Sequence, residues 1–541
     1  MPLPPPRGRS LLVADIWRER RARVHVHERR SDERERHDDA RARPLRALSR
    51  GRVRALWLAA AALIALPVAF GRYLPLQDLP QHLAALRVLT CLHDPAFGFD
   101  ADYVVPSGRV TYLLPYAAGV ALAKVLGVRA VGKVLLAVNM FGTFLGLRAL
   151  ARAVRNDPRS ALFCVPILVG PLFVIGLVPF LLGVMLLTWA LAASARFAAE
   201  PTVARGLGLS ALALAVALTH PIPFVVLVAG HASFVVAGAR DRWRAAIPPL
   251  IPAGALFAYF LAATDAGAVA RTITGTGGVG TRVPLGTAAV ELFGWVADAF
   301  VDRSDDLIAA LALLVALAAT ALAWHGGRVA RAAWGIALLP LGCAAIYFGS
   351  EMSHGDTWPL APRYAFLGAI LVVPLLRIPP GRAGRGVVLA ASLLAVSAVV
   401  NDAVHFAAFD REAAALDGVL ARMRPRAHVA SLVFDGSSKV VRFHPYLHAG
   451  AYYQVDRGGV VQFSFAGYDH WPVDFRDGRY PPPGGPAAPG WEWHPERVPA
   501  SELVPYFDYV LVRGAGFSPP PGAFEKTYAS GGYELWSAKA P

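Results

Sequence analysis

Long apolar runs recur between residues 55 and 404, and they constrain the fold of this chain more than any other feature. An α-helix needs a run of about 20 apolar residues to cross the hydrocarbon core of a bilayer. Over 541 residues the hydrophobic share is 55% and the charged share only 17%. The sequence therefore predicts a polytopic α-helical membrane protein, with the lipid bilayer as its first partner.

The expected membrane helices lie near residues 56–70, 161–175, 177–195, 207–219, 223–238, 246–262, 307–324, 332–348, 364–376 and 386–404. Two more apolar segments, 111–126 and 131–147, are followed by arginines that two full crossings would place outside. Either one of these segments is re-entrant or interfacial, or the charge bias fails there. We expect about eleven crossings in all.

The distribution of basic residues predicts how the chain is oriented across the membrane. Residues 1–54 hold sixteen arginines against eight acidic residues, mix the two signs and lack aromatic interleaving. Such a stretch is typical of a disordered cytoplasmic tail, with lipid headgroup contact as an alternative, and it does not indicate nucleic-acid binding. Alternate connectors share this basic character, which leaves the C-terminus outside. They contain Arg196, Arg205, Arg240, Arg242, Arg244, Arg328, Arg331, Arg377, Arg382 and Arg385.

Residues 405–541 differ from the rest because they carry Trp, Tyr, Pro and Gly among dispersed charges and contain no spanning run. We expect a small α/β extramembrane domain with a helix at 411–423, strands at 428–434 and 508–512, and a final hairpin turning at Gly531-Gly532. The predicted organisation is a tail (1–54), a transmembrane domain (55–404) and an outer domain (405–541). The outer loops of the transmembrane domain are 71–110, 263–306 and 349–363. Three widely separated cysteines exclude a disulfide framework or a CxxC metal pair.

Asp78 and His82 follow the first apolar run and lie four residues apart, so they can share one face of a helix. Ionisable groups beside a membrane are costly and tend to be functional. We therefore predict Asp78 as the catalytic residue and His82 as a substrate-binding partner. The alternative is that Asp78 only caps a helix, since Pro80 lies near a first helical turn.

Four other residues at expected outer helix ends are substrate-binding candidates: His220, His354, Asp356 and Arg363. A guanidinium at such a position can bind a phosphate bidentately, although it could also extend to the interface. His220 beside a proline could instead cap a helix end. The ordinary interpretation of His354 and Asp356 is loop polarity.

Two features of the 263–306 loop are weaker signals. The glycine run at 272–280 is not a P-loop, because no Gly-Lys-Ser/Thr follows, and we interpret it as a flexible loop or a lid. Asp298, Asp302, Asp305 and Asp306 are interpreted as a solvated loop end, with metal binding as the less favoured alternative because their spacing fits no calcium loop.

This layout resembles the GT-C superfamily of membrane glycosyltransferases, which includes the protein O-mannosyltransferases and lipid A aminoarabinose transferases. The resemblance rests on the acidic residue in the run Asp78-Leu-Pro-Gln-His82 just past the first helix, on the many later helices with polar outer loops, and on the soluble outer domain at the end. The chain differs in having one acid, not an adjacent acidic pair, in its first loop.

The resemblance implies a polyprenyl-phosphate-linked sugar as donor and an acceptor reached from the outer face of a bacterial inner (plasma) membrane. Asp78 would act on the acceptor as a base or through a divalent metal such as Mg or Mn, and Arg363 is the candidate for the donor phosphate. The alternative is a non-catalytic polytopic protein, either a lipid or polysaccharide transporter or an assembly factor. Nearly charge-free helix interiors favour chemistry at the surface over transport.

Overall fold

The structure is a computed structural model, and it describes residues 50–109, 111–238, 243–263, 280–324, 331–354, 357–468, 470–482 and 492–539. The chain divides into two compact units, Met1–Ala59 and Ala60–Pro541. Only the start of α2 (Arg50–Ile64) is described in the first unit, so the predicted tail lies almost entirely outside the described residues.

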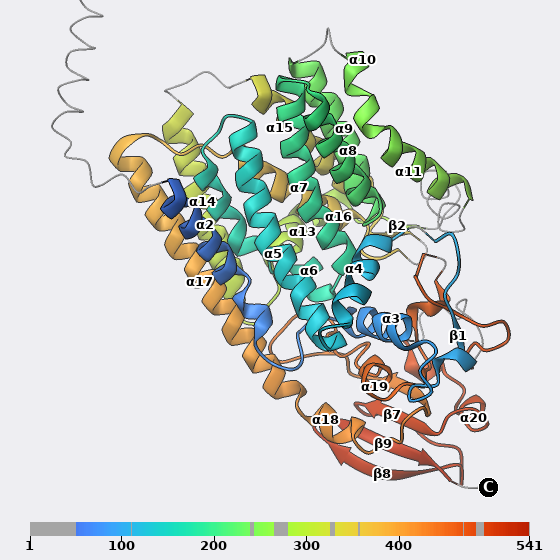
Figure 1. The fold of residues 1–541 in the computed structure, drawn as a ribbon. Helices are drawn as coiled ribbons and strands as arrows, with labels where there is room; N and C mark the ends of the chain where they lie inside the picture. The colour runs from blue at the N-terminus through green and yellow to red at the C-terminus, as the bar shows by residue number, and fades with distance from the viewer. Residues whose placement is uncertain are drawn as a thin grey trace, which may run out of the picture. The chain divides into compact units, whose positions relative to one another are not determined.

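Most of the described chain is helical (Figure 1). Apolar runs form helices because a helix bonds its own backbone groups where lipid offers no partner. Besides α2, the helices, with η for 3-10 helices, are η1 (Leu66–Ala69), α3 (Leu79–Cys91), η2 (Phe99–Ala101), α4 (Leu113–Ala123), α5 (Val128–Ala153), η3 (Pro158–Ile167), α6 (Pro171–Ile175), α7 (Val178–Ala199), α8 (Val203–Ala217), α9 (Pro221–Gly238), α10 (Trp243–Ala246), η5 (Pro248–Leu250), α11 (Ile251–Ala263), α13 (Leu285–Ala297), α14 (Ser304–Trp324), α15 (Arg331–Gly349), α16 (Ala361–Val372), η6 (Val373–Leu375), α17 (Gly381–Ala413), α18 (Ala415–Leu420), α19 (Ala451–Arg457), η7 (Phe465–Gly467), η8 (Pro495–Arg497) and α20 (Ala500–Leu503).

Among the described residues, five helical stretches are long and apolar enough to cross a membrane. They are Val128–Ala153, Val178–Ala199, Trp243–Ala262, Ser304–Trp324 and Gly381–Leu420. Shorter apolar helices accompany them at Leu113–Ala123, Val203–Ala217, Pro221–Ala237, Leu285–Ala297, Ala333–Gly349 and Ala361–Leu375. By the length and composition of its helices, this is a membrane protein.

Helices α14 and α17 pack against each other with small residues inside and large apolar residues outside. Leu314 of α14 is 62% exposed and Leu393 of α17 is 60% exposed. This pattern is the reverse of a helix in water and suits a surface that faces lipid. The buried positions in the middle of the two helices are alanines, namely Ala309, Ala312, Ala316 and Ala319 on α14 and Ala391, Ala395 and Ala398 on α17.

Three segments differ from their predicted form. Residues 161–175 form η3 and α6 rather than one helix, because Pro166 and Pro171 interrupt the backbone ladder. The predicted loop 263–306 contains the apolar helix α13. Helix α17 continues through the predicted domain boundary at 404, since no glycine or proline interrupts residues 387–413, and the helix predicted at 411–423 is its end together with α18.

The C-terminal region contains a five-stranded sheet of order β5-β4-β7-β9-β8 (Figure 1). Its strands are β4 (His428–Val433), β5 (Val460–Val461), β7 (Tyr509–Arg513), β8 (Phe524–Ser530) and β9 (Tyr533–Ala538). Strand β4 is parallel to β5 and β7, whereas β9 is antiparallel to β7 and β8. The predicted strands at 428–434 and 508–512 and the hairpin at Gly531-Gly532 are confirmed.

Segment 71–110 is joined to this C-terminal region. Strand β1 (Tyr103–Val104) pairs antiparallel with β6 (Asp474–Phe475), and α3 packs against α19. The Gln81 side chain donates to Phe463 O at 3.1 Å and accepts from Phe465 N at 3.3 Å. These bonds hold residues far apart in sequence around one cavity. A second small sheet pairs β2 (Gly280–Thr281) with β3 (Ser353–His354).

Candidate active site

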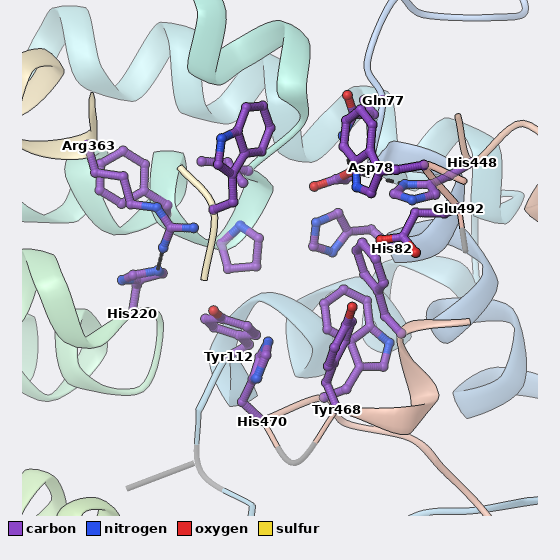
Figure 2. Close-up of a pocket in the computed structure, with 17 residues that line it drawn as sticks. Gln77, Asp78, His82, Tyr112, His220, Arg363, His448, Tyr468, His470 and Glu492 are labelled. Atoms are coloured by element: carbon purple, nitrogen blue, oxygen red, sulfur yellow. Dashed lines mark hydrogen bonds and ion pairs between the residues drawn. The ribbon is translucent and has the colours of Figure 1, made fainter. Parts of the chain in front are cut away.

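A cavity of about 140 Å³ lies between the C-terminal region and the ends of several helices (Figure 2). A dry cavity of roughly this volume can hold one benzene-sized ring, so the site is of the size of a small ligand group. Its lining residues are Gln77, Asp78, His82, Tyr112, Leu177, Pro179, Phe180, His220, Trp358, Arg363, His448, Phe465, Tyr468, His470, Trp471, Glu492 and Trp493.

The structure brings together Asp78, His82, His220 and Arg363, four of the six site residues predicted from sequence. Asp356 and the side chain of His354 lie outside the described residues, as does the glycine run except for Gly280. The backbone of His354 lies in β3. Within the described residues, the predicted site is therefore built from α3, α16 and the turn before α9.

Asp78 occupies the N-cap position of α3 with Pro80 behind it, yet its side chain makes no capping hydrogen bond. Its Oδ1 lies 3.0 Å from Nδ1 of His448 and accepts from Nε2 of Gln77 at 3.3 Å. The alternative that Asp78 serves only as a helix cap is therefore wrong for its carboxylate, because the side chain is 11% exposed and turned toward the cavity (Figure 2).

The backbone fixes the position of this carboxylate. The Gln77 and Asp78 amides donate to Val174 O and Ile175 O, each at 2.9 Å. Gly176 follows with φ of +88°, and a Cβ there would lie 3.0 Å from the Asp78 nitrogen. A glycine is thus required both by the left-handed backbone and by the close approach of the two chain segments.

His448 is the residue that the sequence could not assign, because its partner Asp78 is distant in the chain. It is 5% exposed, stacks on Phe463 at 5.1 Å and meets Phe465 edge-on at 5.0 Å. The 3.0 Å separation from Asp78 is that of an ion pair, but among the described residues neither ring nitrogen has a partner with hydrogen-bond geometry. The imidazole can therefore bond an additional group in the cavity.

His82 lies one helical turn after Asp78 and is 7% exposed. Its Nδ1 lies 2.7 Å from the Tyr116 hydroxyl, and its ring packs 5.0 Å from that of Trp471. Burial lowers the pKa of His82 to about 4, and the nearby Asp78 carboxylate only partly opposes that shift. His82 is consequently a neutral hydrogen-bonding group near pH 7.

Arg363 and His220 form the opposite side of the cavity (Figure 2). Arg363 is 8% exposed at the start of α16, so its side chain does not extend to an interface. Its Cζ lies 5.7 Å from the Phe180 ring centroid, and its Nε has no hydrogen-bond partner among the described residues. This buried cation has unused donor capacity.

The contact between Arg363 and His220 indicates which kind of ligand group the two side chains would bind. His220 Nδ1 accepts from the Ile222 amide at 3.2 Å, which caps α9 and leaves the proton of the neutral ring on Nε2. That Nε2 lies 3.4 Å from Arg363 Nη1, so in this tautomer the ring cannot accept from Arg363, whereas the other tautomer would leave the Ile222 amide without its acceptor. Burial, together with Arg363 and His470, holds the pKa of His220 well below its ordinary value, so an additional proton cannot relieve the arrangement. An acceptor bonded to both groups would relieve it.

Other lining residues escaped the sequence analysis because only the fold collects them. His470 lies 5.5 Å from the Tyr112 ring, and burial lowers its pKa to about 4. Trp471 packs against Phe465 at 4.9 Å. Trp358 and Trp493 lie 6.0 Å apart at the edge of the cavity. The enrichment of aromatic residues after position 405 was the only sequence signal for part of this wall.

A metal centre at Asp78 has little support. In the described part of the chain, one group of three metal-ligating side chains has ligand atoms within 4.8 Å of one another, and it consists of Asp298, Asp305 and Asp306. Asp78 does not belong to it. The surroundings of Asp78 fit a base or a hydrogen-bond acceptor better than a Mg or Mn ligand.

No protein-family model matches the chain, and a comparison with curated proteins finds no similar sequence. The geometry of the cavity is therefore the basis for assigning a function.

Proposed function

We propose that this protein is a membrane glycosyltransferase of the GT-C type. It would move a sugar from a polyprenyl-phosphate donor to a lipid, glycan or protein acceptor on the outer face of a bacterial inner membrane. The observation that carries the proposal is one cavity with a donor-rich side at Arg363 and His220 and a carboxylate side at Asp78 (Figure 2).

The Arg363 side suits a phosphate. Arg363 Nη1 lies 3.4 Å from His220 Nε2, and the guanidinium has an unpaired Nε among the described residues. Phosphate oxygens can accept from all of these donors, and hydrogen bonds to a charged acceptor are the stronger kind. The same donors would stabilise the negative charge that develops on a phosphate as it leaves the anomeric carbon.

The Asp78 side suits an acceptor hydroxyl. In this proposal the carboxylate takes the hydroxyl proton while the oxygen attacks the anomeric carbon and the bond to phosphate breaks. His448 Nδ1, 3.0 Å from the carboxylate at ion-pair distance, would act on it electrostatically as a positioning residue. The aromatic wall that includes Trp471 would pack against the apolar face of the sugar ring.

About eleven crossings remain part of the proposal, with the N-terminus in the cytoplasm and the C-terminal domain outside. The lengths of two helices support one assignment of residues 111–160, because α4 has 11 residues and α5 has 26. At about 1.5 Å per residue, α4 is too short to span a bilayer of about 30 Å, and α5 is long enough. Helix α4 is then the re-entrant segment, which leaves the arginines after α5 cytoplasmic.

The test is complementation of a deletion strain followed by profiling of cell-envelope glycolipids and glycoproteins. Asp78→Asn keeps the side-chain shape but removes the base, so we expect the affected glycan to fall by about 100-fold or more. Asp100→Asn is the matched control, since Asp100 is exposed in the same segment and does not line the cavity.

The protein level in the membrane and the apparent unfolding temperature of each variant show whether folding is intact. Full glycan levels with Asp78→Asn would contradict the enzyme proposal. An unchanged envelope in the deletion strain would favour the non-catalytic transporter or assembly factor.

A further inference from the structure

A second polar cluster lies at the junction of α13 and α14 and does not belong to the cavity. Asp298 follows the last residue of α13, while Asp305 and Asp306 lie in the first turn of α14. One carboxylate oxygen from each of the three lies within 4.8 Å of the others. Three carboxylates at this spacing repel one another unless cations or protons are placed among them.

The cluster is not the solvated loop end that the sequence suggested. Asp305 is only 5% exposed, and its Oδ2 accepts from the Ala299 and Phe300 amides at 2.6 and 3.2 Å. Its Oδ1 is buried and has no hydrogen-bond partner among the described residues, and the same holds for Oδ1 of Asp298 and of Asp306. A buried carboxylate oxygen without a donor disfavours the folded state.

The neighbouring cations supply only part of what these oxygens need. Arg442 Nη1 pairs with Asp298 Oδ2 at 2.7 Å, but it leaves Oδ1 of Asp298 unpaired. Asp402 of α17 adds another carboxylate that is 5% exposed and interacts electrostatically with Asp305. The three carboxylates that approach one another therefore still need a cation or protons among them.

We propose that Asp298, Asp305 and Asp306 bind one hard divalent cation of the Ca²⁺, Mg²⁺ or Mn²⁺ class. Such ions take carboxylate oxygens as ligands and complete their shells with water. The site lies where the loop after α13 meets the C-terminal region, because Arg442 N donates to Ala299 O at 2.9 Å and Val301 N donates to Val440 O at 3.1 Å. A bound cation would stabilise this junction.

The test is titration of the purified full-length protein with Mn²⁺ after chelator treatment, with bound ion measured by electron paramagnetic resonance. We expect one Mn²⁺ per chain. Asp306→Asn and Asp305→Asn should weaken binding on the order of tenfold or more. Asparagine at 305 keeps an acceptor for the two backbone amides, so that variant should still fold.

Asp302→Asn is the matched control. Asp302 lies in the same loop, its side chain is 59% exposed, and Ser304 and His405 already contact it. Its Mn²⁺ affinity should equal that of the parent protein. No stoichiometric binding by the parent protein, or full binding by both Asp305→Asn and Asp306→Asn, would overturn the site. Loss of Mn²⁺ in Asp78→Asn would place the ion at the cavity instead and would also overturn it.

Discussion

Three buried side chains of the cavity have polar atoms without hydrogen-bond partners among the described residues: Gln77 Oε1, Arg363 Nε and both ring nitrogens of His448. Each such group disfavours the folded state by about 1–3 kcal/mol, so proteins rarely keep several together unless a ligand uses them. Here they include an acceptor, a cationic donor and an imidazole. A ligand with both an anionic group and hydroxyls would satisfy them together.

Burial of His82 predicts that the free energy of unfolding of this protein depends on pH. Its folded-state pKa is about 4, whereas an unfolded histidine titrates near 6.5. The unfolded state binds more protons below pH 6.5, so the contribution of neutral His82 is complete above 6.5 and is lost as the pH falls toward 4. Roughly 3 kcal/mol is the upper limit of this loss.

Unfolding temperatures measured in detergent between pH 7 and 4 check this prediction. The decline should be shallower for His82→Gln than for the parent protein, because glutamine does not titrate. His93→Gln, at an exposed position just after the same helix, should leave the slope unchanged. Parallel curves for His82→Gln and the parent protein would refute the assignment.

Single residues differ in how well sequence could identify them. Asp78, His82, His220 and Arg363 could be predicted because each lies at the end of an apolar run, and the charge bias predicted the same side of the membrane for all four. His448 could not, because its role depends on a contact with Asp78 across 370 residues. Asp305 was misinterpreted because solvation cannot be inferred from a local acidic pattern.

Helix α19 joins the C-terminal region to α5 through one well-formed ion pair. Arg129 of α5 donates from Nε and Nη2 to the two oxygens of Asp456 at 3.0 and 2.7 Å. Its guanidinium also lies 4.4 and 5.0 Å from the ring centroids of Tyr452 and Tyr73. The bidentate geometry and the two rings use the planar shape of arginine.

Arg129→Met should lower the free energy of unfolding by roughly 1–3 kcal/mol, because it leaves the half-buried Asp456 carboxylate without its strongest partner. Unfolding in detergent measures the loss. Lys526→Met is the control, since the Lys526–Glu534 pair has side chains that are 44% and 31% exposed. An exposed pair contributes about 0–1 kcal/mol, so equal losses in the two variants would contradict this role of Arg129.

Elements were predicted best where one physical requirement dominated. Apolar length alone located α5, α7, α14 and α17, since backbone groups in lipid must bond within their own helix. Prediction failed at η3 and α6, where prolines divide one apolar run, and at α13, whose apolar residues lie in a segment interpreted as a loop. In both cases the apolar residues could be recognised in the sequence, but the local backbone conformation that they adopt could not.

At the scale of the whole molecule, the cavity takes residues from both the helical part and the C-terminal region, so neither part contains the site alone. The proposed orientation places this site on the outer face and the arginine-rich connectors in the cytoplasm. That arrangement can be tested independently of any activity.

Labelling of whole cells with a membrane-impermeant maleimide tests the orientation in a Cys91→Ser background, where the remaining native cysteines are buried. Asp100→Cys and Glu525→Cys, both at exposed positions, should be labelled from outside. Arg382→Cys, in a predicted cytoplasmic connector, should react only after the cells are opened. The opposite pattern would invert the topology and remove the cavity from the outer face.

The sequence by itself determined the membrane character, the approximate positions of most helices, the change of composition near residue 405 and most of the candidate site residues. These follow from composition and short-range periodicity, which act within one element. Only the tertiary structure decided that the Asp78 carboxylate faces His448 instead of capping α3, that Arg363 is buried against His220, and that Asp305 is not solvated. Each of these outcomes depends on contacts between elements, and no local pattern in the sequence encodes which distant side chain will be the neighbour.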